Sequence, residues 1–83
     1  MIKIYTRDNC PWCVKAKELM HSLGLEYKEF KLGIDYSRDD LNQLIPADRP
    51  LTVPQIFFHN QYIGGYTDFA EYVEDHGIMG LQT

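Results

Sequence analysis

Apolar and polar residues alternate at the start of the chain and then take up a helical period. Residues 2–5 read Ile-Lys-Ile-Tyr, a short alternating run of β-favouring side chains that predicts a strand. Proline is favoured at the first position of a helix and glycine just beyond its end, and Pro11 and Gly24 stand at these places. The pattern predicts a helix over about residues 12–23. Its apolar face consists of Cys13, Ala16, Leu19, Met20 and Leu23.

A second strand and a shorter helix follow. Residues 27–32 predict a strand, and the order strand, helix, strand implies a right-handed parallel pair. Ser37 is a favourable N-cap, so we expect a helix from there through Leu44 and Ile45. Pro46 ends this helix because proline cannot continue one.

The second half of the chain predicts a hairpin and a third helix. Residues 53–58 and 61–63 are β-favouring, and only His59 and Asn60 separate them, which indicates a tight antiparallel hairpin. Thr67 and Asp68 supply capping residues for a helix that Gly77 ends. The order β-α-β-α-β-β-α belongs to the α/β class and predicts a four-stranded mixed sheet flanked by three helices. With 83 residues, we expect one domain over residues 1–83, whose last residues carry no pattern.

The charge of the chain excludes some classes of partner. The formal net charge is −4, which leaves no basic footprint for nucleic acid or an anionic membrane. Residues 1–31 hold six basic and four acidic residues, whereas residues 32–83 hold two basic and eight acidic ones. Arg7 and Lys15 therefore flank a region that favours a negative charge. No apolar run is long enough for a signal peptide or a membrane span, and we expect a cytoplasmic protein.

The two cysteines carry the strongest chemical signal. Cys10-Pro11-Trp12-Cys13 lies between a predicted strand and a predicted helix, so Cys10 faces the free N–H groups and positive dipole of the helix N-terminus. Both effects favour a thiolate and lower the pKa of Cys10 below that of an ordinary thiol. Cys10 is thus the sulfur that attacks an external disulfide and forms a mixed disulfide with it. Cys13 points inward, and either Cys13 or an external thiol then resolves this mixed disulfide. A structural zinc site would need four ligands, and no second cysteine pair or histidine spacing supplies them.

With these residues in place, the chain resembles a glutaredoxin, a compact bacterial or phage-type dithiol member of the thioredoxin fold. The resemblance rests on three segments in register: residues 6–13, read TRDNCPWC; residues 52–57, read TVPQIF; and residues 64–68, read GGYTD. Two departures stand out. Trp12 replaces a commoner tyrosine, and the acidic segment 33–51 matches no chemistry that we can assign.

The resemblance implies a glutathione site beside Cys10. It implies that Pro54 follows a cis peptide bond and brings the backbone of Thr52 and Val53 close to Cys10, where it can pair with the cysteine of glutathione. Arg7 would attract the glycyl carboxylate, and Trp12 would form an apolar wall. The γ-glutamyl end would contact Gly65, Tyr66, Thr67 and Asp68.

The resemblance further implies a glutathione-dependent thiol–disulfide oxidoreductase that reduces protein disulfides and glutathione mixed disulfides. Glutathione would be a co-substrate, and no tightly bound cofactor is expected. Ribonucleotide reductase is a candidate protein partner. The protein itself is expected to be a monomer. Two alternatives remain open at this point. Electrons could come from thioredoxin reductase, although the segment 64–68 argues against it. A dimer could instead bind a [2Fe–2S] cluster through Cys10 and glutathione, although Pro11 should hinder it.

Overall fold

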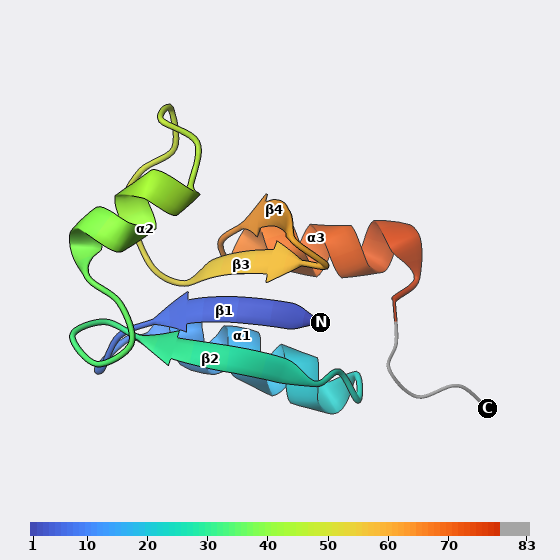
Figure 1. Cartoon of the computed structure of the whole chain (residues 1–83). Coiled ribbons are helices and arrows are strands. Elements are labelled where there is room, and N and C mark those ends of the chain that lie inside the picture. Colours follow the sequence, from blue (N-terminus) through green and yellow to red (C-terminus); the bar gives the residue numbers. More distant parts are fainter. Residues whose placement is uncertain (79–83) are drawn as a thin grey trace.

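The computed structural model describes residues 1–78 and contains the seven elements in the predicted order (Figure 1). The last residues, for which the sequence carries no pattern, lie outside the described part. The elements are β1 (Ile2–Thr6), α1 (Pro11–Ser22), β2 (Tyr27–Lys31), α2 (Arg38–Leu44), β3 (Gln55–Phe58), β4 (Gln61–Gly64) and α3 (Tyr66–His76).

The four strands form one mixed sheet in the order β2-β1-β3-β4. β1 pairs with β2 in parallel and with β3 antiparallel, and β3 and β4 form the predicted antiparallel hairpin. His59 and Asn60 both take positive φ angles, of 51° and 67°, as a two-residue hairpin turn requires. β1 therefore lies inside the sheet, and the loop that follows it leads to Cys10 at the start of α1.

α1 and α3 cover one face of the sheet, as Figure 1 shows. The alternation in β1 turns Ile2, Ile4 and Thr6 toward this face, and all three are buried. Ile2 and Ile4 pack with residues from both helices and from β3, of which Phe69 is fully buried. This main core fixes the N-termini of α1 and α3 relative to the sheet, and both N-termini belong to the candidate site.

A second apolar cluster lies around α2. Tyr36, Leu41 and Ile45 are buried there against Tyr5 and other side chains of the sheet. The Tyr36 hydroxyl donates a hydrogen bond of 2.7 Å to the carbonyl oxygen of Thr6, and its burial raises the pKa of Tyr36. This bond ties the segment before α2 to the end of β1, close to the cysteines.

Several predicted boundaries are wrong by one or two residues. β3 begins at Gln55 rather than at residue 53, because Pro54 has no N–H to donate to a neighbouring strand. β2 ends at Lys31. α1 begins at Pro11 and ends at Ser22, one residue earlier at each end than predicted, and Gly24 beyond it has a φ of 71°.

The start of α3 needs a larger correction. Gly65 is the N-cap, and Thr67 and Asp68 lie inside the first turn rather than before it. Asp68 still satisfies the helix start, because its Oδ2 accepts a hydrogen bond of 3.2 Å from the N–H of Gly65. A carboxylate at this third position caps by reaching back, which is the second half of a capping box.

Candidate active site

Cys10 and Cys13 lie at the N-terminus of α1, as the sequence predicts. Cys10 is the N-cap, Pro11 follows at the first helical position, and the two cysteines form a disulfide with their Cα atoms 5.2 Å apart. The N–H of Cys13 donates to the Sγ of Cys10 at 3.1 Å, so this sulfur is the acceptor that caps the helix. Cys10 is 7% exposed and Cys13 only 2%, which leaves Cys10 the more accessible of two largely buried sulfurs.

A cavity of about 400 Å³ lies beside this pair and gathers residues from three separate parts of the chain. These parts are the first turn of α1, the loop before β3 and the start of α3. Its lining consists of Trp12, Thr52, Val53, Pro54, Gly65, Tyr66, Thr67 and Asp68. Every one of these eight residues appears among the glutathione-site residues expected from the resemblance.

The loop before β3 presents an open backbone edge toward Cys10. The Val53–Pro54 peptide bond is cis, as expected, and the carbonyl oxygen of Val53 lies 3.8 Å from the Sγ of Cys10. Within residues 1–78, the N–H of Val53 donates to no other group. An unpaired N–H and C=O beside a reactive sulfur can bind a short extended peptide as an added strand.

Two aromatic side chains form one wall of the cavity. The rings of Trp12 and Tyr66 lie 5.5 Å apart, and Trp12 is about half exposed. The ammonium of Lys15 lies 5.5 Å from the centre of the Trp12 ring. An exposed aromatic ring with a cation above it provides both an apolar surface and a local positive charge near Cys10.

Arg7 lies on the other side of the loop from this wall. It does not line the cavity of Trp12 and Tyr66 but lines a neighbouring one of about 400 Å³, which shares Thr52 and Val53 with the first. Of the other expected glutathione-site residues, only Thr52 and Val53 line the same cavity as Arg7. Thr52 and Val53 line both cavities, so the two cavities meet at these residues.

Arg49 stands just before residues 52–57, where the sequence suggests only that it helps to hold a carboxylate. Its Nη2 donates to the Oδ2 of Asp68 at 2.8 Å, and its guanidinium lies 5.5 Å from the centre of the Tyr62 ring. A loop arginine 19 positions before an acidic helix residue has no spacing signal that would predict the pair. Asp68 is thus already an ion-pair partner, in addition to lining the cavity.

Glu29 lies in a third cavity, of about 550 Å³, which both cysteines also line. Its carboxylate accepts hydrogen bonds from Thr6 Oγ1 at 2.7 Å and from Lys17 Nζ at 3.0 Å. Burial alone would raise the pKa of Glu29, but these two bonds and the charges of Lys17 and Lys31 outweigh it and lower the pKa. Glu29 therefore stays charged and is partnered next to the cysteines.

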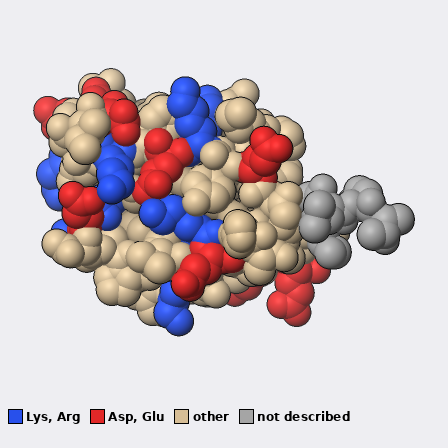
Figure 2. Space-filling model, turned by 90° about the horizontal axis from the view of Figure 1, so that it is seen from below, with Lys and Arg blue, Asp and Glu red and all other residues tan. Residues whose placement is uncertain are grey.

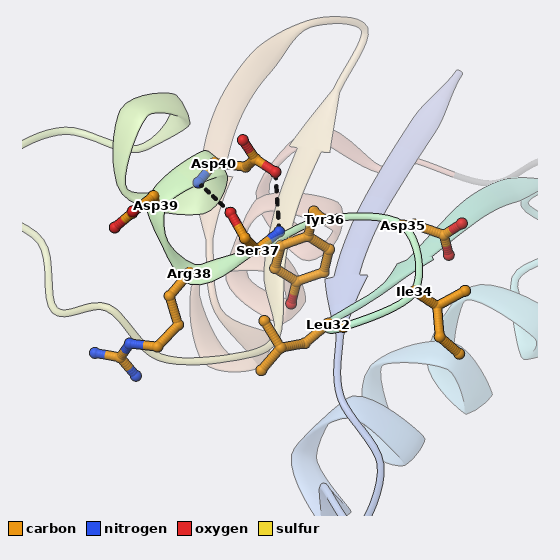
Figure 3. Close-up of a pocket in the computed structure, with 9 residues that line it drawn as sticks. Leu32, Ile34, Asp35, Tyr36, Ser37, Arg38, Asp39 and Asp40 are labelled. Carbon is orange, nitrogen blue, oxygen red and sulfur yellow. Dashed lines mark hydrogen bonds between the residues drawn. The ribbon is translucent and has the colours of Figure 1, made fainter.

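The first part of the acidic segment 33–51 lines a cavity of about 740 Å³, which residues 32–40 form together (Figure 3). Two of its carboxylates have local structural partners. Asp40 accepts from the N–H of Ser37 at 2.9 Å while its own N–H donates to the Ser37 hydroxyl, and Asp35 accepts from the N–H of Lys31 at 2.9 Å. These bonds explain Asp35 and Asp40 as turn and cap residues.

Metal-ligand clusters and membrane-spanning helices are both absent from residues 1–78. No group of three or more His, Cys, Asp or Glu side chains there could hold a metal ion. None of the helices in this part is long and apolar enough to cross a membrane. On the face drawn in Figure 2, basic and acidic side chains are interspersed rather than gathered into one basic area.

Comparisons with known proteins define the class. The family model of glutaredoxins matches residues 2–63, and the chain belongs to the glutaredoxin family. It is 43% identical to glutaredoxin 1 of Escherichia coli K12 over 82 residues, covering 88% of this chain and 92% of the relative.

Solved structures agree with this assignment. The structure of reduced E. coli glutaredoxin has a TM-score of 0.72 at 41% identity, covering 89% of this chain and 93% of that one. A buckwheat glutaredoxin in complex with glutathione has a TM-score of 0.74 at 25% identity, covering 90% and 69%. The thioredoxin-like fold is confirmed, and with its Cys10–Cys13 pair the chain is a thiol–disulfide oxidoreductase.

Proposed function

We propose that this protein is a glutathione-dependent dithiol glutaredoxin, which reduces protein disulfides and glutathione mixed disulfides. The observation that carries the proposal is the cavity beside Cys10, whose lining combines an open backbone edge, an aromatic wall and the carboxylate of Asp68. A tripeptide thiol lying on Thr52 and Val53 would bring its sulfur to Cys10, its glycyl carboxylate toward Arg7 and its α-ammonium group toward Asp68. Glutathione has these groups in this order.

The reaction consists of successive thiol–disulfide exchanges. The Cys10 thiolate attacks one sulfur of a substrate disulfide, forms a mixed disulfide and releases the other sulfur as a thiolate. In a protein disulfide, Cys13 then attacks Cys10, which frees the second substrate thiol and leaves the Cys10–Cys13 disulfide. One glutathione thiolate opens that disulfide to give glutathionylated Cys10. A second attacks the glutathionyl sulfur, so that two electrons pass from two glutathione molecules to the substrate.

The test is the consumption of NADPH with the mixed disulfide of glutathione and 2-mercaptoethanol as substrate. One reaction contains glutathione and glutathione reductase, and the other contains thioredoxin reductase alone. Turnover only with glutathione supports the proposal. Turnover only with thioredoxin reductase would overturn it and identify an electron carrier of the thioredoxin type.

A matched pair of variants assigns the site. Asp68→Asn removes the charge that would face the α-ammonium group, and we expect the KM for the mixed disulfide to rise about tenfold with little change in kcat. Asp75→Asn removes the same charge from an exposed position at the far end of α3 and should leave KM unchanged. Equal effects of the two substitutions would contradict a binding role for Asp68.

The proposal extends to partners and location. Proteins with accessible disulfides are the expected substrates, and ribonucleotide reductase is the candidate that the family resemblance provides. It can be tested by turnover of oxidised reductase with glutathione and this protein as the sole electron source. We further propose a monomer that works in the cytoplasm, which sedimentation and cell fractionation can test.

A further inference from the structure

Arg49 stands behind the wall of the cavity rather than in it. It lies in the loop between α2 and β3 and does not line the cavity, but its guanidinium binds Asp68, which does. The ion pair measures 2.8 Å, and both side chains are only partly exposed, at 37% for Arg49 and 44% for Asp68. Arg49 therefore reaches the cavity through its contact with Asp68 rather than by lining it.

The bonds to Asp68 are unequal between its two oxygens. Oδ2 accepts from Arg49 and from the N–H of Gly65, at 2.8 and 3.2 Å. Among residues 1–78, Oδ1 accepts no hydrogen bond from the protein. Two donors from different directions fix the rotation of the carboxylate, and the oxygen left over is the one that can receive a ligand.

The backbone leaves room for this arrangement at Gly64. Its φ is 128°, a region that side chains disfavour, and a Cβ built there would collide with the carboxylate of Asp68 and lie 2.9 Å from Nη2 of Arg49. At the end of β4, the ion pair thus occupies the space that a side chain at Gly64 would fill. The contact is built into the end of the strand, unlike an incidental pairing of two surface side chains.

The other side of Arg49 faces a network that holds the opposite wall of the cavity. Its guanidinium lies against the Tyr62 ring, and the Tyr62 hydroxyl donates to Gln55 Oε1 at 2.6 Å. Gln55 is buried, and its Nε2 donates to the carbonyl oxygen of Thr52 at 2.7 Å. Contacts through Arg49 therefore connect Asp68 to the backbone edge on which the ligand would lie.

We propose that Arg49 is a positioning residue that sets the specificity of the site for ligands with a free α-ammonium group, the γ-glutamyl class of peptides. This inference rests on the proposed function. Arg49 holds Oδ2 so that Oδ1 is left to receive the ammonium group. Without Arg49 the carboxylate rotates and the orientation of its free oxygen is lost.

The test compares two substrates that differ only at this end. One is the mixed disulfide of glutathione and 2-mercaptoethanol. The other replaces the γ-glutamyl group by glutaryl and so lacks the α-ammonium. Reduced protein is mixed with each substrate in the absence of free glutathione, quenched with acid and analysed by mass. The loss of the dithiol form gives the rate constant for attack by Cys10, because Cys13 resolves the mixed disulfide to the Cys10–Cys13 disulfide. The ratio of the two rate constants measures preference for the ammonium group and cancels any loss of folded protein.

We expect the wild-type protein to prefer the glutathione substrate and Arg49→Gln to lower that preference about fivefold, with the rate on the glutaryl substrate little changed. Arg49→Lys keeps the positive charge and should restore part of the preference. The control is Lys28→Gln, which removes an exposed cation that also lies over an aromatic ring, at 5.4 Å from the centre of Phe30, and should leave the ratio unchanged.

Two outcomes separate the inference from the function on which it rests. A wild-type preference that Arg49→Gln leaves intact, or a loss of rate on both substrates in equal proportion, would overturn the role of Arg49 while the proposed function stands. Equal wild-type rates on both substrates would overturn recognition of the γ-glutamyl end by Asp68, and the inference would fail with it.

Discussion

The unequal environments of the two cysteines lead to a prediction about their reactivity. Cys13→Ser leaves a single thiol at the N-cap of α1, and Cys10→Ser leaves a single thiol one turn further on, 2% exposed. A hydrogen bond to a charged acceptor contributes about 1.5–3 kcal/mol, and a helix N-terminus about 0.3–1 kcal/mol. Because sulfur is a weak acceptor, we take about 2 kcal/mol in favour of the Cys10 thiolate, a factor of about 30 in its population.

Burial acts in the opposite direction at Cys13, since an apolar environment favours the neutral thiol. We expect iodoacetamide to alkylate the Cys10 thiol at pH 6.5 at least about 30-fold faster than the Cys13 thiol. The pH dependence of the rate separates ionisation from access, because restricted access scales the curve without moving its midpoint. A midpoint for Cys13→Ser at or above that of the same variant in denaturant would refute the argument from the helix N-terminus.

Activity should follow reactivity, so we expect Cys10→Ser to abolish all turnover. Cys13→Ser should still remove glutathione from mixed disulfides but should no longer reduce protein disulfides. Identical activities of the two variants would contradict the assigned roles. Glu29→Gln should lower stability at pH 7 by about 1 kcal/mol, or about 4–8 °C in Tm. Since the folded state lowers the pKa of Glu29, this deficit should be full above the ordinary value of 4.5 and fade below it, in thermal melts across that range. Phe69→Ala removes a fully buried ring and should cost about 3–5 kcal/mol in urea unfolding, enough to leave a substantial unfolded fraction. Gly64→Ala should displace the carboxylate of Asp68 and raise the KM for the glutathione mixed disulfide, whereas Gly33→Ala, where a Cβ meets nothing, should change stability alone.

The elements could be predicted from sequence because their ends depend on local chemistry. Pro11 and Gly24 bound α1, and Gly77 ends α3 with a φ of 60°, each through a backbone property of that residue. The start of α3 was harder, since Asp68 can cap a helix either from before it or from inside its first turn, and only the packed structure distinguishes the two.

The candidate site divides in the same way. Its cysteines follow from the position of a short motif at a strand–helix junction, and the cavity lining follows from the family resemblance. The sequence suggested for Arg49 only that it helps to hold a carboxylate. Its ion pair with Asp68 could not be predicted, because the partner is distant in sequence and the β3–β4 hairpin lies between them. Arg7 was assigned correctly to the neighbourhood of Cys10, but its place in a separate cavity depends on how the loop before β3 divides the surface.

The sulfur that caps α1 is also the sulfur that exchanges electrons, so folding and redox chemistry form one thermodynamic cycle. When Cys10 is reduced to a thiolate, the N–H of Cys13 faces a full negative charge, and when it is oxidised the same N–H faces a neutral sulfur. This hydrogen bond therefore stabilises the folded protein more in its reduced state than in its oxidised state. Because free energies around a closed thermodynamic cycle sum to zero, this extra stabilisation makes the disulfide easier to reduce in the folded protein than in the unfolded one. The end of one helix thus contributes to the direction in which electrons flow through the whole molecule.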